Sequence, residues 1–207
     1  MKKTLIKRTL MTIVGVSLVS VAVALLRLSD LGTDPYTVLV MGLAHAFDST
    51  YFVIFTIVSV ALLVGALIFA RNLLGFGTVC VLLLIGAIAD QVFNVLVNVF
   101  PDPTVLTRSL LLIGGIAVMC LGSSLYYTAD LGVSPYDCVA LRLSRKHPKR
   151  FKYIRITADL TCTGIGFVLG GTVGVGTVVT AFFMGPLIAW MNEHIAKPLL
   201  KEKASAD

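Results

Sequence analysis

Long apolar runs separated by short polar or glycine- and proline-containing breaks dominate the chain. A helix needs about 20 mostly apolar residues to cross a hydrocarbon core about 30 Å thick. Six runs meet this requirement, at about residues 9–28, 51–70, 73–98, 105–127, 154–170 and 173–195. The pattern therefore predicts an all-α membrane protein with six transmembrane helices.

Two further segments have a helical pattern but are too short to span, at about residues 35–47 and 135–146. Each begins with proline and follows a residue that can cap a helix, Asp34 or Ser134. Asp137 adds a carboxylate near the positive end of the second helix dipole. We interpret both as re-entrant or interfacial half-helices, because two more full spans would bring several arginines and lysines into the bilayer, which is costly.

The chain contains an internal repeat. Residues 29–36 read S-D-L-G-T-D-P-Y and residues 129–136 read A-D-L-G-V-S-P-Y, so five of eight positions match at an offset of 100. A second motif is also repeated: residues 75–79 read G-F-G-T-V and residues 174–178 read G-V-G-T-V, at an offset of 99. We therefore divide the chain into repeats 1–103 and 104–207, each with three spans and a half-helix. Three is an odd number, so the second repeat enters the bilayer inverted, as in many secondary transporters.

The positive charges predict the orientation. With the N-terminus in the cytoplasm, fifteen of the 17 lysines and arginines fall on the cytoplasmic side, including the basic loop around residues 142–155. The positive-inside rule thus predicts a bacterial inner-membrane protein with both termini cytoplasmic. We expect the first helix to be retained, because its apolar run is about long enough to span and has a counterpart in mid-chain. The net charge of +6 does not indicate a nucleic-acid partner, because the basic residues cluster beside apolar runs.

The paired D-L-G-x-x-P-Y turns and the G-x-G-T openings of later spans resemble the bacterial YczE/YyaS/YitT type of integral membrane protein. The resemblance covers about residues 8–195. One departure is that the family's position after the second proline is often tryptophan, whereas both copies here have tyrosine, Tyr36 and Tyr136. The resemblance implies a multi-spanning cell-membrane protein and assigns no functional residue, because the family's activity is largely unassigned.

A polar site between the repeats is the leading functional hypothesis. The half-helix starts offer backbone N–H groups that favour an anion or a polar group, although a purely structural turn explains them as well. Asp90 and Asp159 lie in predicted spans, where carboxylates face a partner, water or the bundle interior. Asp90 also fits a solvated position near a helix end, and Asp159 a pair with Arg155 four residues earlier. The candidate substrate-binding residues are Asp34, Pro35, Tyr36, Thr78, Asp90, Ser134, Pro135, Tyr136, Asp137, Asp159 and Thr177.

We therefore predict a small secondary transporter or permease for a polar solute, with an anion as one candidate. The histidines are scattered and neither H-E-x-x-H nor G-x-S-x-G occurs, so no enzyme, cofactor or metal site is predicted. The expected partners are the lipid bilayer and an unknown small-molecule solute, with a homodimer or a membrane partner left open. The alternatives are an accessory or regulatory protein of a membrane complex and a substrate-binding subunit of an energy-coupling-factor-like transporter.

Overall fold

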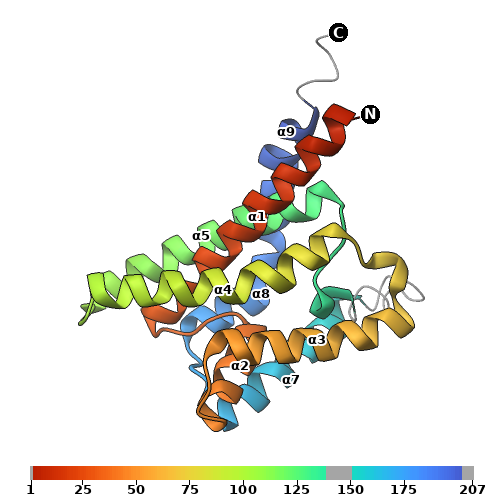
Figure 1. Ribbon diagram of the computed structural model, residues 1–207. Helices are drawn as coiled ribbons and strands as arrows, with labels where there is room; N and C mark the ends of the chain where they lie inside the picture. The colour runs from red at the N-terminus through yellow and green to blue at the C-terminus, as the bar shows by residue number, and fades with distance from the viewer. Residues whose placement is uncertain (1, 139–150, 202–207) are drawn as a thin grey trace.

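The computed structural model describes residues 2–138 and 151–201, which form helices and connecting turns with no strand among them (Figure 1). The long helices are α1 (Lys2–Ser29), α3 (Tyr51–Phe69), α4 (Phe76–Val99), α5 (Val105–Ala129), α7 (Phe151–Val168) and α8 (Val175–Met191). The short elements are α2 (Pro35–Ala46), a 3-10 turn (Arg71–Leu73), a π-helical stretch (Asn192–Ala196) that continues α8, and α9 (Lys197–Lys201).

Five helical segments are long and apolar enough to cross a membrane, and the protein is a multi-helix membrane protein. These segments are Thr4–Ser29, Tyr51–Phe69, Phe76–Val99, Val105–Ala129 and Val175–Leu200. Large apolar side chains such as Ile68 and Ile113 point outward on them, as expected of surfaces that contact lipid.

The fifth predicted span, residues 154–170, is present as the helix α7 (Phe151–Val168), but its composition does not qualify it as a span. Its 18 residues include three charged ones, Lys152, Arg155 and Asp159. The first predicted half-helix is present as α2. Of the second, residues 135–138 are helical, and its remainder, with most of the predicted basic loop, lies outside the described residues.

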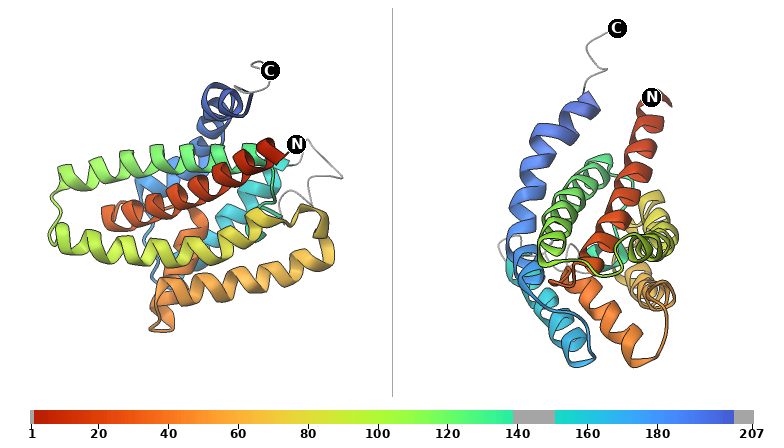
Figure 2. Two further views of the ribbon diagram at one scale, coloured as in Figure 1. Left: turned by 45° about the horizontal axis from the view of Figure 1, so that its top comes forward. Right: turned by 90° about the vertical axis from the view of Figure 1, so that its left-hand side faces the viewer.

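Helix α1 packs most extensively against α5 and also against α4, and these three helices lie side by side (Figure 2, left). At the crossing of α1 and α5, a Cβ on Gly15 would lie 2.7 Å from the carbonyl oxygen of Gly122, and the reverse is also true. Where α2 meets α7, a Cβ on Gly166 would lie 2.5 Å from the oxygen of Val38. Glycine therefore permits both close backbone approaches, as in other membrane helix pairs.

The two D-L-G turns have matching backbone conformations. Asp30 and Asp130 end α1 and α5 in the left-handed region, with φ of 54° and 52°. Two residues later Gly32 and Gly132 have φ of 99° and 110°, which L side chains adopt only with strain. The repeat in sequence is thus a repeat in local structure.

Each turn docks on the other half of the chain. The carbonyl of Leu31 accepts a hydrogen bond of 2.8 Å from the backbone N–H of Gly176, at the start of α8. The carbonyl of Leu131 accepts one of 2.7 Å from the N–H of Gly77, at the start of α4. Each G-x-G-T segment therefore forms the contact surface for the D-L-G turn of the other half. The glycines of the segment have no side chain, so the turn can approach the backbone closely.

The first turns of α1 and the helix α9 lie at the same end of the structure, and Met11 and Leu200 belong to one apolar cluster (Figure 1).

Candidate functional site

A cavity of about 850 Å³ lies between the two D-L-G-x-x-P-Y turns. Its wall includes residues 34–37 of the first turn and residues 133–137 of the second, together with side chains from the surrounding helices. The volume falls within the range of small-molecule sites in proteins. The cavity is therefore the candidate site, and it brings most of the predicted residues together.

Both half-helix starts face this cavity with their first turns already capped. Asp34 Oδ2 accepts a hydrogen bond of 3.1 Å from the N–H of Thr37. Ser134 Oγ accepts one of 3.1 Å from the N–H of Asp137. Proline follows each cap and contributes no N–H. The caps thus occupy N–H groups that an anion would need.

The two repeats meet in the cavity through their tyrosines. The rings of Tyr36 and Tyr136 stack with centroids 5.0 Å apart and planes inclined by 30°. Phe55 meets Tyr36 edge-on at 5.8 Å. The centre of the site is therefore aromatic, with rings contributed by both halves of the chain.

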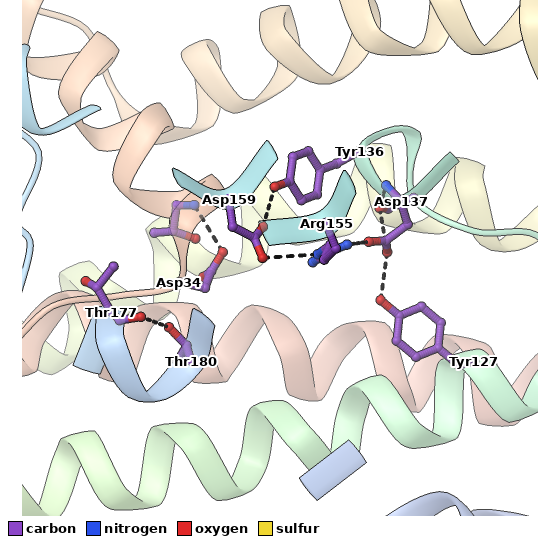
Figure 3. A network of polar contacts seen from close by, with 10 residues as sticks. Asp34, Tyr127, Tyr136, Asp137, Arg155, Asp159, Thr177 and Thr180 are labelled. Atoms are coloured by element: carbon purple, nitrogen blue, oxygen red, sulfur yellow. Dashed lines mark hydrogen bonds and ion pairs between the residues drawn. The ribbon is translucent and has the colours of Figure 1, made fainter. Parts of the chain in front are cut away.

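A charged network occupies the wall made by the second repeat (Figure 3). Arg155 Nη1 contacts Asp137 Oδ1 at 2.5 Å, and Arg155 Nε contacts Asp159 Oδ2 at 3.3 Å. Tyr127 donates to Asp137 at 2.7 Å, and Tyr136 donates to Asp159 at 2.5 Å. The guanidinium also lies 4.8 Å from the centre of the Tyr136 ring. One arginine thus joins the second half-helix start to α7.

The equivalent wall of the first repeat has one carboxylate, Asp34, and no basic side chain among the described lining residues. Tyr36 pairs with Ser59 at 2.8 Å as Tyr136 pairs with Asp159, so this contact recurs at an offset of 100. At the same offset, Phe55 of α3 corresponds to Arg155 of α7. The two halves thus contribute matching positions to the site, but only the wall of the second repeat contains an ion-pair network.

Acidic side chains outnumber basic ones in the wall. Among the described lining residues, the ionisable carboxylate and basic groups are Asp34, Asp137, Asp159 and Arg155. Three carboxylates against one guanidinium give a formal charge of −2. This balance favours a cation over the anion suggested by the half-helix starts.

Three predicted residues lie outside the cavity wall. Thr78 Oγ1 donates to the carbonyl of Val133 at 2.7 Å, and Thr177 Oγ1 accepts from the N–H of Gly174 at 3.4 Å. These two threonines support the docked turns. Asp90 forms an ion pair of 2.7 Å with Arg27 and accepts from the N–H of Phe52. Asp90 therefore joins α4 to α1 and α3.

Sequence reasoning missed several lining residues. The sequence pattern indicates Arg155 only as a partner of Asp159, favours an interfacial anchor for Tyr127 and gives no role to Ser59, yet all three line the cavity. Extending the offset of 100 beyond the motif would have paired position 59 with position 159. Tyr127 carries no such signal. Within residues 2–138 and 151–201, no group of three or more His, Cys, Asp or Glu could hold a metal ion.

Comparisons with known proteins find relatives without a known activity. A model of a protein family of unknown function, DUF6198, matches residues 6–193. An uncharacterized protein of Haemophilus influenzae is 28% identical over 88% of this chain and 82% of its own. The uncharacterized membrane protein YczE of Bacillus subtilis is 26% identical over 99% of this chain and 98% of its own. YyaS of the same organism, also uncharacterized, is 23% identical over 91% of both. No solved structure matches the chain.

Proposed function

The chain belongs to DUF6198, a family of unknown function of YczE/YyaS type, and from that premise we propose that it is a small secondary transporter or permease. A polar solute binds in the cavity between the two halves. The observation that carries the proposal is the cavity itself, which is bordered by the starts of both half-helices. Interrupted helices in matching positions commonly form the substrate site of transporters built from repeats.

In the proposed topology, six helices form two inverted repeats, 1–103 and 104–207, in a bacterial inner membrane, with both termini cytoplasmic. Helix α7 is the fifth span, and its Arg155 and Asp159 line the cavity. The docked turns support this topology. The first turn bonds to Gly176, which the six-span path places on the outer side with it, and the second bonds to Gly77, on the inner side.

Alternating access follows from the exchange of turns between the repeats. Since each turn is bonded to a helix start of the other half, a tilt of one repeat shifts each turn relative to the half-helix that follows it. The Tyr36–Tyr136 stack lies at the meeting point of the two half-helix starts. The solute thus binds where the two repeats move against each other.

Cysteine accessibility tests the permease. Ser123 lines the cavity and is 7% exposed. Ser123→Cys is made after replacing the four native cysteines, and sealed vesicles of each orientation receive a membrane-impermeant thiol reagent. Thr4→Cys and Asp102→Cys mark the inner and outer faces. If the protein is a permease, the reagent modifies Ser123→Cys from both faces of the membrane. Modification from neither face refutes the permease function.

The second candidate is an accessory protein of a membrane complex. Gly65, Gly114 and Gly164 lie on different helices, and a Cβ on each would meet no described atom within 4 Å. Such open small-residue positions suit close approach by a partner helix. Crosslinking from Gly114→Cys in native membranes tests it, and a stoichiometric partner supports this function. A chain that crosslinks to no other protein, or only to itself, contradicts it.

A further inference from the structure

We propose that the cavity binds a small organic cation whose body is apolar or aromatic, with its charged group beside Asp34. This inference rests on the proposed function, because it names the class of solute at the same site. Three features of the wall support it: an uncompensated carboxylate, a cluster of aromatic rings and an apolar remainder.

The carboxylate is that of Asp34. Arg155 is shared between Asp137 and Asp159, whereas no basic side chain of the described residues lies within ion-pair distance of Asp34. Its Oδ2 accepts from a backbone N–H. Its Oδ1 is buried and has no hydrogen-bond partner in the described part of the chain. A buried carboxylate oxygen in this state is costly unless a donor or a cation completes it.

The aromatic rings suit a cation for a second, independent reason. The faces of tyrosine and phenylalanine attract ammonium groups within about 6 Å of the ring centre. Tyr36, Tyr136, Tyr51 and Phe55 all line the cavity. The hydroxyls of Tyr51 and Tyr126, which also lines it, are buried without a hydrogen-bond partner among the residues described. These oxygens can accept from an ammonium N–H.

The remainder of the wall sets the shape of the solute. Val19 and Val23 of α1, Val81 and Ile85 of α4, and Met119 of α5 present apolar surface to the cavity. A metal ion or a small hydrated cation would leave this surface wet, whereas an alkyl or aryl body would cover it. An anion would meet a wall of charge −2 in which the single guanidinium already binds two carboxylates.

The test uses the full chain in lipid nanodiscs and three probes of similar shape. These are 4-phenylbutylammonium, 4-phenylbutanol and 4-phenylbutyrate, which are a cation, a neutral molecule and an anion. Calorimetry measures each Kd. We expect the Kd of the ammonium to be at least about tenfold lower than the Kd of the other two probes. The reason is that one ionic contact in a site without water lowers Kd by about tenfold or more.

Asp34→Asn is the informative variant, because asparagine still caps the N–H of Thr37 while removing the charge. We expect it to weaken ammonium binding about tenfold or more. Asp102→Asn, an equal charge change at an exposed position between α4 and α5, should leave the Kd within about twofold. The wild-type probe series remains decisive if Asp34→Asn does not fold.

The cation proposal is overturned by three results: no ammonium binding at millimolar concentrations, equal binding of the alcohol or the carboxylate, or an unchanged Kd in Asp34→Asn. Uptake of the ammonium probe into proteoliposomes distinguishes a failure of the cation proposal from a failure of the transport proposal. Binding without uptake, with Ser123→Cys reactive from neither face, retains the cation site and refutes transport. Reactivity from both faces without cation selectivity retains transport and refutes the cation.

Discussion

Gly132→Ala tests whether the exchange of turns between the two halves holds the fold together. Gly132 has φ of 110°, and a Cβ there would lie 2.5 Å from the backbone nitrogen of Gly75 and 2.8 Å from its Cα. Both neighbouring atoms are backbone, so no flexible side chain can move aside. The D-L-G turn at Gly132 must therefore adopt a strained backbone conformation and also move away from the start of α4.

The expected cost has two parts. A left-handed conformation costs a residue with a Cβ about 1–2 kcal/mol. Withdrawal of the turn weakens the bonds from Gly77 N–H to Leu131 and from Thr78 to Val133, at about 0.5–1.5 kcal/mol each. We therefore expect the free energy of unfolding to fall by about 2–5 kcal/mol.

Equilibrium unfolding by SDS in mixed micelles, followed by circular dichroism, measures this change. Gly114→Ala is the matched control, because a Cβ there meets no described atom within 4 Å, and a helical alanine in place of glycine gains up to about 1 kcal/mol. Gly32→Ala should cost about as much as Gly132→Ala, since its φ is 99° and its Cβ would lie 2.5 Å from Gly174 N. If Gly132→Ala were as stable as the control, the docking of the turns would be refuted.

Three further substitutions distinguish residues that bind the solute from residues that only stabilise the structure around the cavity. Tyr136→Phe should cost about 1–3 kcal/mol of stability in the same assay, because Asp159 loses its 2.5 Å donor inside the cavity; an unchanged stability would contradict that bond. Asp90→Asn should cost about 1–3 kcal/mol by weakening the pair with Arg27, yet leave the Kd of 4-phenylbutylammonium unchanged, because Asp90 does not line the cavity. Thr78→Val should lower the unfolding midpoint by removing two hydrogen bonds, without altering the charge selectivity of binding, and a selectivity change would place this residue in the site.

Local patterns in the sequence were sufficient to predict the long helices and the residue at which the first half-helix begins. The run at 51–70 predicts α3 at Tyr51–Phe69, because its length and apolarity are properties of consecutive residues. Asp34 followed by proline predicts the start of α2, because a cap bonds within its own first turn. The repeat of the D-L-G turn likewise predicted two matching loops, whose backbone angles agree.

Contacts between distant residues required the tertiary structure. The sequence could not show that Gly32 meets Gly174, or that Gly132 meets Gly75, because a glycine motif does not specify its neighbour. For the same reason the alternatives for Asp90 stayed open until Arg27, 63 residues away, proved to be its partner.

By itself, the sequence determined that the chain forms several apolar helices long enough to cross a membrane and that it contains a repeated pair of motifs. Both conclusions depend on order along the chain, namely the length of an apolar run and the recurrence of a motif. Only the tertiary structure decided that the two turns enclose one cavity and that its wall is acidic. The charge of a site is the sum over side chains that folding brings together, and Asp34, Asp137 and the Arg155–Asp159 pair come from three separate segments of the chain.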